Sequence, residues 1–560
     1  MGRMSAGYAV VEALAAQGVR HVMGLVGSCV VEILDGMYGR EDMSFLSVRH
    51  EQAAAMMADG FARVSGAPAV CMATNGPGAC NLLTGVGNAH LAQSPVVVLT
   101  GAPTLRDQGR ESIQELDQVS LFRPITKWSV QVKCPERVAD TIREAFQVAR
   151  AGMPGPVHVD LPRDILIEEV DFVPAPSEGG ADAAPGADPE AMERAAELLA
   201  SAQRPFIIAG GGVLWCEAVG ALAGVAERLG APVGTATGRN DAFPSRHPLA
   251  VGPVGRGALP EAVSLLREAD VVLAAGTRLA HSTTLFNPQF FGPGVRLVHL
   301  ALEPRTIGRN YPVAVGIVAD IRRGLGALRD ALASRKPTAK PHLGSRLAAL
   351  REARERRLGE GARMGGVPIK PQRFYAELAR QLPEEAIVAL DVGSACHYAY
   401  GLLSFQRPRT FLTSQDLACI GFGFPAALGA KLARPDRPVV CVTGDGGFLC
   451  NGAELETAVR LKLPVITFIL NNFNYGSERA YQKFFYGGRY VGDAIGNPPF
   501  DDYARVFGAR GLRVEEPGEL AGVVAEALRQ PEPALVDILC DPDELPEPRR
   551  KDVVRPRGRS

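Results

Sequence analysis

Short apolar runs rich in β-branched residues recur along the chain, and segments of helix length separate them. Strands that are apolar on both sides are buried on both faces, so these runs predict parallel sheets covered by helices. The sequence therefore predicts an α/β fold with three doubly wound parallel-sheet domains. The first and third domains look like one architecture used twice. The clearest runs are PAVCMAT, PVVVLTG and PVHVDLP, then RPFIIAGGG, DVVLAAGT and RLVHLAL, and finally AIVALDVG, PVVCVTGDG, PVITFILNN and PALVDILC.

Two stretches interrupt this pattern. Residues 173–191 are rich in proline, glycine and alanine, which is typical of a linker. Residues 334–366 place a charged helical pattern between clusters of helix breakers. They divide the chain into predicted domains at 1–172, 190–333 and 367–560.

Composition and charge exclude several classes of function. The 560 residues carry a net charge of −1 and 46% are apolar, whereas a nucleic-acid partner requires a basic face. No apolar run reaches the ~20 residues of a membrane span. The amphipathic N-terminal pattern also lacks the apolar core of a signal peptide. We therefore expect a soluble cytoplasmic protein with no nucleic-acid partner and no membrane partner.

Residues 439–472 join two predicted strands through one helix and place polar groups at both strand ends. Parallel α/β sheets bind ligands at the carboxyl ends of their strands. A carboxylate with two neutral oxygens suits Mg²⁺, and glycines at a helix start let backbone N–H groups approach a phosphate. The segment therefore predicts a Mg²⁺ site that anchors a diphosphate ester. Its residues are Asp445 with Gly446 and Gly447 behind it, and Asn472 with the carbonyl of Asn474.

A strand ending in Gly-Asp-Gly, a helix and a strand ending in Asn-Asn form the motif of thiamine diphosphate (ThDP) enzymes, and the chain resembles that family. The resemblance implies an acid near the end of the first domain's second strand, where Glu51 stands in HEQAAAMMADGFARVSG. This carboxylate would share a proton with N1′ of the aminopyrimidine, so that the 4′ nitrogen can accept the thiazolium C2 proton. Ile420, in CIGFGFPAALGAK, matches the apolar wedge beneath the bent cofactor.

Further expectations follow from the same resemblance. The three domains become a pyrimidine-binding domain, a central nucleotide-binding-like domain, and a diphosphate- and Mg²⁺-binding domain with a basic tail. Gly393, Ser394 and Gly476 would contact the cofactor, and Gln114 would point at the reacting carbon. In the relatives the cofactor lies between the first domain of one chain and the third domain of its partner. The resemblance therefore implies a homodimer or homotetramer.

The similarity is closest to the acetolactate synthase branch, through segments such as TNGPGACNLLTGV and GPVHVDLPRDI. Within this branch RNDAFPSRHPLAVGPVG, YGSERAYQKFFYGGRYVG and LPEPRRKDVVRPRG resemble the sulfoacetaldehyde acetyltransferases. Such enzymes expel sulfite from an aldehyde with a β-sulfonate and pass the acetyl group to phosphate. Both anions require cations, and the expected ones are Arg479, Lys483, Arg489 and the arginines of the tail.

Other substrates stay open. Acetolactate synthases carry a tryptophan after Asn-Asn for a second 2-oxo acid, and Gln-His in the third domain, where this chain has Tyr481 and Ser394-Ala395. LDQVSLFRP and the basic tail also fit oxalyl-CoA decarboxylases and 2-hydroxyacyl-CoA lyases. The substrate is thus an aldehyde, a 2-oxo acid or an acyl-CoA. In each case the enzyme would make or break a C–C or C–S bond beside a carbonyl, through an acyl or enamine intermediate at C2 of the cofactor.

The central domain holds one weaker signal. Gly210–Gly212 follow a predicted strand in IIAGGGVL, which is part of a dinucleotide-binding fingerprint. Relatives bind FAD or ADP in this domain, so the resemblance implies FAD or ADP here as well.

Overall fold

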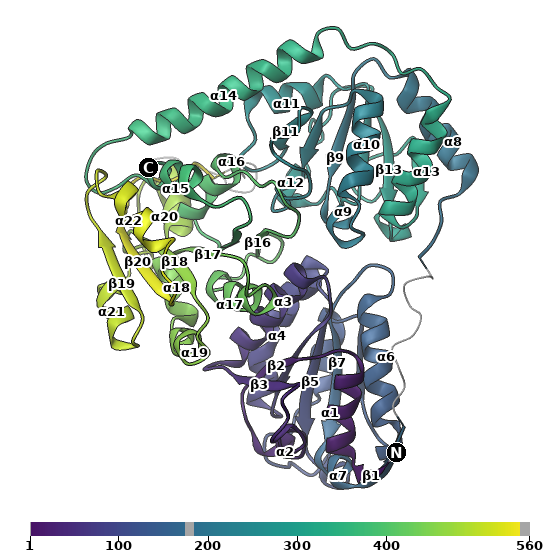
Figure 1. Cartoon of the computed structure of the whole chain (residues 1–560), viewed down its shortest axis with the longest axis vertical. Coiled ribbons are helices and arrows are strands. Elements are labelled where there is room, and N and C mark those ends of the chain that lie inside the picture. Colours follow the sequence, from purple (N-terminus) through teal and green to yellow (C-terminus); the bar gives the residue numbers. More distant parts are fainter. Residues whose placement is uncertain (1, 174–183, 549–560) are drawn as a thin grey trace. The chain divides into compact units, whose positions relative to one another are not determined.

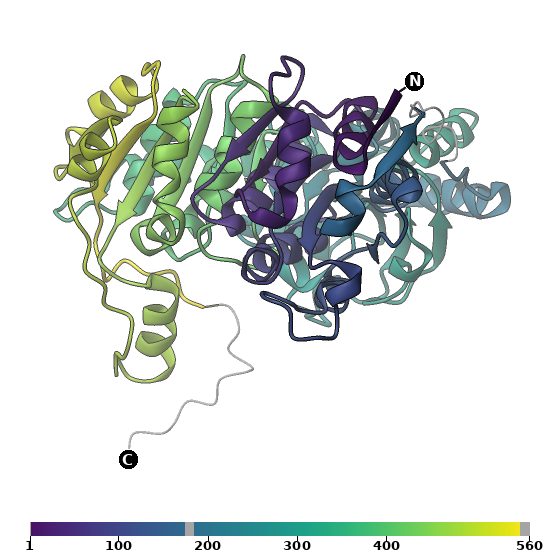
Figure 2. The same ribbon diagram turned by 90° about the horizontal axis from the view of Figure 1, so that it is seen from below.

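The computed structural model describes residues 2–173 and 184–548, which form three six-stranded sheets and one two-stranded ribbon (Figure 1). In the ribbon, β1 (Gly2–Ser5) pairs antiparallel with β8 (Glu169–Phe172), and Figure 2 shows it beside the mark for the N-terminus. Most of the first predicted linker and the basic tail from residue 549 lie outside the described residues.

The first sheet has the strand order β3-β2-β4-β5-β7-β6, and all neighbouring strands are parallel. Every residue of β4, β5 and β7 is buried, as apolar runs covered on both faces require. The strands are β2 (His21–Gly24), β3 (Ser44–Ser47), β4 (Ala69–Ala73), β5 (Val96–Ala102), β6 (Trp128–Gln131) and β7 (Val157–Pro162). The helices are α1 (Ala6–Ala16), α2 (Val31–Met37), α3 (Glu51–Ser65), α4 (Pro77–Ala92), α5 (Gln118–Phe122), α6 (Val138–Arg150) and α7 (Arg163–Ile167).

The third sheet has the order β16-β15-β17-β18-β20-β19. Counted from its own first strand this is 2-1-3-4-6-5, the same order as in the first sheet. The predicted reuse of one architecture is therefore confirmed. The strands are β15 (Ile387–Leu390), β16 (Phe411–Thr413), β17 (Val439–Gly444), β18 (Val465–Asn471), β19 (Arg510–Val514) and β20 (Ala534–Leu539). The helices are α15 (Pro371–Gln381), α16 (Ala399–Leu402), α17 (Gly423–Ala433), α18 (Asp445–Asn451), α19 (Glu454–Arg460), α20 (Gly476–Phe485), α21 (Phe500–Val506) and α22 (Leu520–Ala527).

The central sheet has the order β11-β10-β9-β12-β13-β14, or 3-2-1-4-5-6 in its own numbering. This is the doubly wound order of dinucleotide-binding folds. All three sheets thus have the predicted α/β class. The strands are β9 (Pro205–Ala209), β10 (Val233–Thr235), β11 (Ala250–Pro253), β12 (Val271–Ala275), β13 (Arg296–Ala301) and β14 (Val315–Val318). The helices are α8 (Pro189–Ser201), α9 (Gly211–Trp215), α10 (Val219–Leu229), α11 (Pro260–Arg267), α12 (His281–Thr284) and α13 (Ile321–Ala333).

The charged helix predicted within residues 334–366 is α14 (Leu343–Arg363). It is not a loose tether, because Leu350 and its neighbours Leu347 and Ala353 are buried in the core of the central region. Its other end packs against α15, as Figure 1 shows. The helix therefore joins the central sheet to the third one, and most of its charged residues remain on the outside.

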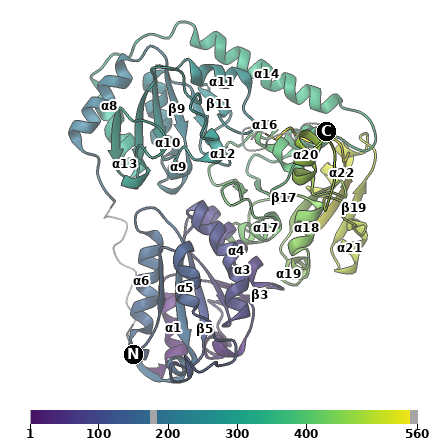
Figure 3. The same cartoon turned by 180° about the vertical axis from the view of Figure 1, so that it is seen from behind.

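The chain folds as two compact units. One combines the first sheet and its helices with Asp416–Val439 and Phe448–Val465, and the other holds the central and third sheets. In the first unit α3 packs against both α4 and α17, which Figures 1 and 3 show side by side. A Cβ on Gly60 would lie 2.2 Å from the carbonyl oxygen of Ala426, and one on Gly429 1.9 Å from that of Met57. Glycine at both positions is what allows the two backbones to approach.

Candidate active site

Asp445 lies at the carboxyl end of β17, at the first residue of α18, and is 1% exposed. Its Oδ2 accepts a hydrogen bond from Nδ2 of Asn497 at 2.6 Å, and the backbone N–H groups of Gly446 and Phe473 also donate to it. Burial raises the pKa of Asp445 to about 6. Within the described residues no cationic side chain pairs with this carboxylate. A buried carboxylate held only by amides suits a site that a divalent cation completes.

The two asparagines predicted as metal ligands lie beside Asp445. Asn472 follows β18 and is 6% exposed, and its Oδ1 accepts the N–H of Asn474 at 3.2 Å. Phe473 lies between them in the left-handed region, with φ of 56°, which turns its N–H toward Asp445. The structure therefore brings together Asp445, Asn472 and Asn474.

Asn497 is a member of this group that sequence reasoning missed. Its Nδ2 donates to Asp445 and also to Oδ1 of Asn471, at 3.1 Å. It lies in the irregular segment between α20 and α21, where no strand or helix pattern marks it. Nothing in the sequence indicates that this loop returns to the sheet edge.

Gly393, Ser394 and Gly476, which are also predicted to contact the cofactor, lie at the same corner. Ser394 follows β15 and is 4% exposed, and Gly393 before it has φ of 126°. A Cβ on Gly476 would lie 2.1 Å from Oγ of Ser394 and 3.4 Å from Nδ2 of Asn472. Gly446 and Gly447 form the start of α18, directly after Asp445. Strands β15 and β17 are neighbours at the point where the strand order reverses, which is the usual ligand site of such sheets.

This donor set fits Mg²⁺ bound to a diphosphate. Mg²⁺ is commonly held by one or two carboxylates together with phosphate oxygens and water. Among the described residues no cluster of three or more histidine, cysteine, aspartate or glutamate side chains could hold a metal. The corner instead offers one carboxylate with neutral oxygens, and so leaves coordination positions for a phosphate ligand.

Glu51, in the other unit, is the first residue of α3 and is 6% exposed. Its Oε2 accepts a hydrogen bond from Nδ2 of Asn81 at 2.9 Å, and its Oε1 lies 3.3 Å from where a Cβ on Gly78 would be. Asn81 and Gly78 both belong to α4, which follows the predicted TNGPG turn. The carboxylate is therefore oriented by the neighbouring helix start rather than solvated at a surface.

Two further side chains fix the segments around Glu51 and Ile420, and sequence reasoning identified neither. Oε1 of Glu454 accepts the backbone N–H groups of Arg49 and His50, at 2.9 and 3.1 Å, immediately before Glu51. Nδ2 of Asn451 donates to the carbonyl of Gly421 at 2.8 Å, next to Ile420. Glu454 and Asn451 both lie more than 390 residues after Glu51 in the sequence. Only the fold brings them to the compact unit that contains Glu51.

Ile420 is 39% exposed, which is high for an isoleucine between buried neighbours and suits a side chain that supports a bound group. Gln114 is exposed and has φ of 59°, and its carbonyl accepts a hydrogen bond from Nδ2 of Asn75 at 3.2 Å. Its Cβ would lie 2.8 Å from a Cβ on Gly76, so it covers the turn that leads into α4.

Most of the cationic side chains predicted to bind the substrate already have partners within the protein. Arg479 forms ion pairs with Asp493 at 2.7 Å and Asp543 at 3.4 Å, and its guanidinium lies over the ring of Tyr490. Nζ of Lys483 donates to the carbonyl of Asp543 at 3.0 Å. Arg489 is exposed, and within the described part of the chain it forms no ion pair. The tail arginines lie outside the described residues.

Two of the three glycines expected to bind a nucleotide in the central region form backbone hydrogen bonds within the fold. The N–H of Gly210 donates to the carbonyl of Ala275 at 3.0 Å, and that of Gly212 to the carbonyl of Gly276 at 2.8 Å. A phosphate would therefore compete with backbone bonds at two of the three glycines. FAD or ADP binding stays a prediction.

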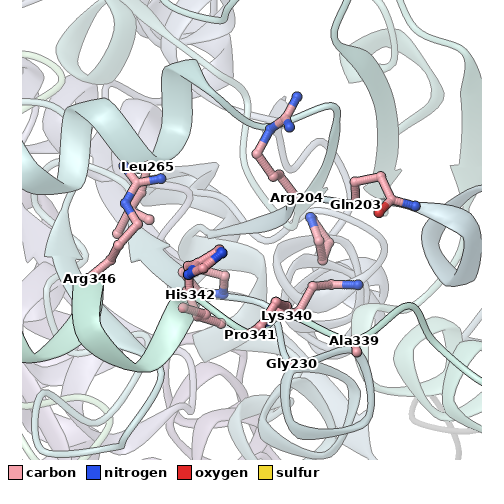
Figure 4. Close-up of a pocket in the computed structure, with 12 residues that line it drawn as sticks. Gln203, Arg204, Gly230, Leu265, Ala339, Lys340, Pro341, His342 and Arg346 are labelled. Atoms are coloured by element: carbon pink, nitrogen blue, oxygen red, sulfur yellow. The ribbon is translucent and has the colours of Figure 1, made fainter.

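A cavity of about 310 Å³ lies at the amino ends of the central strands and is shown in Figure 4. Gln203 and Arg204, which precede β9, line it together with Lys340 and Arg346. Lys340 donates to the carbonyl of Ala202 at 2.8 Å, and Arg346 pairs with Glu268. The cavity contains none of the predicted site residues, and it lies at the edge opposite to the one where α/β sheets bind ligands.

Comparison with known proteins agrees with this geometry. Models of the thiamine pyrophosphate enzyme N-terminal TPP binding domain, central domain and C-terminal TPP binding domain match residues 4–121, 192–328 and 391–538. The chain is therefore a member of the thiamine pyrophosphate (thiamine diphosphate) enzyme family, and the resemblance noted in the sequence is confirmed. Within the described residues, no helix has both the length and the apolar character to cross a membrane.

Its relatives place it more closely, in the acetolactate synthase and sulfoacetaldehyde acetyltransferase branch. It is 37% identical to a probable acetolactate synthase large subunit of Methanocaldococcus jannaschii, over 99% of this chain and 95% of the relative. It is 32% identical to a sulfoacetaldehyde acetyltransferase of Alcaligenes xylosoxydans xylosoxydans, over the same shares. Acetolactate synthase isozyme 3 large subunit of Escherichia coli is 34% identical, over 95% of this chain and 93% of the relative.

Proposed function

We propose that the protein is a ThDP- and Mg²⁺-dependent acetyltransferase that converts sulfoacetaldehyde and phosphate to acetyl phosphate and sulfite. The C–S bond breaks and the sulfonate group leaves as sulfite. The aldehyde carbon becomes the acyl carbon bound to phosphate, and the former CH₂ carbon takes up a proton to become a methyl group. The reaction is balanced without an external oxidant. The observation that carries the cofactor assignment is the buried Asp445 carboxylate, held by amides and without a cationic partner in the described chain.

Bound ThDP supplies the stabilisation of negative charge at the carbon that was the aldehyde carbonyl. The chain's own residues bind it, orient it and move one proton. With the cofactor bound, the carboxylate of Glu51 would hold a proton at N1′ of the pyrimidine, and Ile420 would support the cofactor rings. Gln114 orients the reacting carbon. The metal would be held by Asp445, Asn472 and the carbonyl of Asn474, and the diphosphate end by Gly393, Ser394, Gly446, Gly447 and Gly476.

Two features support the sulfonate substrate. Three stretches resemble sulfoacetaldehyde acetyltransferases, and Tyr481 and Ser394-Ala395 stand where acetolactate synthases carry a tryptophan and Gln-His. A second candidate is a carboligase for 2-oxo acids, favoured by the 37% identity to the Methanocaldococcus jannaschii protein. The acyl-CoA alternative rests on LDQVSLFRP and on the basic tail, which lies outside the described residues.

The proposal includes assembly, because Glu51 and Asp445 belong to different compact units of one chain. Both must contact one cofactor molecule, at its two ends. A homodimer or homotetramer in which partner chains contribute the two halves meets this requirement. FAD or ADP in the central region is part of the proposal, and an absorption spectrum of the purified protein would detect FAD.

One set of assays tests the reaction. The purified protein is supplied with ThDP and Mg²⁺ and offered sulfoacetaldehyde with phosphate, pyruvate, or a 2-hydroxyacyl-CoA. We expect acetyl phosphate and sulfite in equal amounts from the first mixture and no product when ThDP or Mg²⁺ is withheld. Acetolactate from pyruvate at a higher kcat/KM than for sulfoacetaldehyde would replace the proposal by the carboligase.

A further inference from the structure

Arg256 is a half-buried arginine that follows β11 and belongs to none of the groups described above. Its backbone N–H donates to Oγ1 of Thr237 at 3.0 Å, which fixes its loop to the segment after β10. Its Nη1 donates to Nε2 of His397 at 2.5 Å. Within the described residues its Nε is buried and has no hydrogen-bond partner. The guanidinium is therefore anchored at one nitrogen and retains donors that the described chain does not use.

No carboxylate compensates this charge within the described residues. Burial lowers the pKa of the Arg256 guanidinium, and the groups that oppose this shift are the hydroxyls of Tyr400 and Tyr481. Arg357, on α14, is a useful contrast because it donates to the carbonyl of Gly257, the residue after Arg256. Burial also lowers the pKa of Arg357, but Glu261 and Glu360 counteract the shift. A desolvated cation without an acid is costly in a resting structure and is typical of a site for an anion.

Two neighbours of Arg256 belong to segments that begin at the proposed cofactor corner. His397 lies three residues after Ser394, and its N–H donates to the Ser394 carbonyl at 3.1 Å. Tyr481 lies on α20, which begins at Gly476, about 7.5 Å further along the helix axis. Arg256 thus lies beside two segments that both start at the corner. Figure 1 shows α16, which contacts β11, in this region.

The bond to His397 also defines the chemistry of the pair. A guanidinium only donates hydrogen bonds, so Nε2 of His397 is the acceptor and its proton is on Nδ1. The pair therefore has a net charge of +1. A planar guanidinium with unused N–H groups recognises a tetrahedral oxyanion through paired hydrogen bonds. Arg479 and Lys483, in contrast, are already engaged by Asp493 and Asp543.

We propose that Arg256 binds the tetrahedral oxyanion of a substrate, the sulfonate of the donor aldehyde or the phosphate acceptor. The assignment rests on the proposed function for its substrates, although the anion site itself can be tested without turnover. It makes Arg256 a specificity-determining residue of the central region.

The test compares Arg256→Met and Arg256→Lys with the matched control Arg357→Met. Methionine has a similar length without charge, and the control removes a second half-buried arginine that supports the same loop. Steady-state kinetics give separate KM values for sulfoacetaldehyde and phosphate. Calorimetry with ethanesulfonate and with inorganic phosphate measures binding to the ThDP-loaded protein without reaction. Thermal unfolding and the ThDP requirement report whether each variant keeps its fold and its cofactor.

We expect Arg256→Met to raise the KM of one anionic substrate about 10- to 100-fold, the loss typical of a charged hydrogen bond. The dissociation constant of the matching probe should rise equally. Arg256→Lys should lose less, and Arg357→Met should change neither by more than about twofold. If the KM of sulfoacetaldehyde and the dissociation constant of ethanesulfonate rise, Arg256 binds the sulfonate. If the values for phosphate rise, Arg256 binds the phosphate acceptor.

The inference is overturned if Arg256→Met keeps both KM values and both dissociation constants while remaining folded. It is also overturned if Arg357→Met reproduces the effect, because the loop and not the charge would then be responsible. If the wild type binds the probes through Arg256 but does not turn over sulfoacetaldehyde, the anion site stands and the proposed function fails.

Discussion

The first and third sheets have one strand order, 2-1-3-4-6-5, but place different chemistry at their carboxyl edges. The first edge presents Glu51, whose partner is the amide of Asn81. The third presents Asp445, Asn472 and Ser394 around glycines that allow close approach. In the proposed function, the same architecture would carry a proton-transfer group in one copy and a metal and diphosphate corner in the other. Topology fixes where a site forms, and the residues after each strand decide what it does.

The equivalent helices of the two copies also meet. Helix α3 follows the second strand of the first sheet and α17 follows the second strand of the third, and they pack together through Gly60 and Gly429. This contact explains why Asp416–Val439 groups with the first sheet rather than with its own. It brings Ile420 and Glu51 into one compact unit and leaves Asp445 in the other.

The largest effect is expected from removing the proton-transfer group. Glu51→Gln keeps the shape and the bond to Asn81 but cannot share a proton with N1′. We expect kcat to fall by about 10²- to 10⁴-fold, the usual contribution of a general acid–base group. Equilibrium binding of ThDP and Mg²⁺ should change little, because the proposed anchor of the diphosphate is the other edge. Turnover above a few per cent of wild type would contradict the role.

Asp445→Ala should produce the next largest effect, and of a different kind. It removes the one charged ligand proposed for the cation, so the ThDP and Mg²⁺ concentrations required for half activity should rise by at least about 100-fold. With saturating cofactor part of kcat should return, which distinguishes this edge from the Glu51 edge. A variant that copurifies with as much ThDP as the wild type would place the diphosphate elsewhere.

Mixing the two inactive variants tests whether the edges of different chains cooperate. If each site combines Glu51 of one chain with Asp445 of its partner, a mixed dimer has one intact site and one doubly damaged site. Equal mixing under conditions that exchange subunits should then restore about a quarter of wild-type activity, since half of the dimers are mixed. No recovery, with exchange demonstrated by differently tagged chains, would place both residues in the same site of one chain. A fully active monomer in sedimentation would exclude the dimeric site.

The strands, the fold class and the corner around Asp445 could be predicted because they depend on local sequence. A buried parallel strand has its own apolar signature, and a motif spans only the strand and the helix beside it. Asn497 and Glu454 could not be predicted, because each acts across a loop or across hundreds of residues. The ion pairs of Arg479 could not be predicted either. The helix pattern shows its charge but not its partners, and in the structure it pairs with Asp493 and Asp543. Its role toward a substrate stays a prediction.

The smallest effect is expected at Glu454. This residue is the first of α19, and its carboxylate accepts hydrogen bonds from the loop that precedes Glu51. In Glu454→Gln an amide oxygen still accepts the N–H groups of Arg49 and His50, so kcat should fall only a few-fold and stability by about 1 kcal/mol. Glu454→Ala removes Oε1, the shared acceptor of both N–H groups, and should cost about 1–3 kcal/mol, with a larger loss of kcat, because two backbone N–H groups lose their partner.

The pH dependence of the unfolding free energy provides an independent check on the role of Glu454. Burial raises the pKa of Glu454 above its usual 4.5. The folded protein therefore binds more protons here than the unfolded chain, and this site stabilises the wild type as the pH falls through the raised pKa toward 4.5. Glu454→Gln has no such proton, so the difference in unfolding free energy between wild type and variant should shift in favour of wild type on acidification. A difference that is constant from pH 7 to pH 4.5 would show that burial against the loop before Glu51 does not raise the pKa of Glu454.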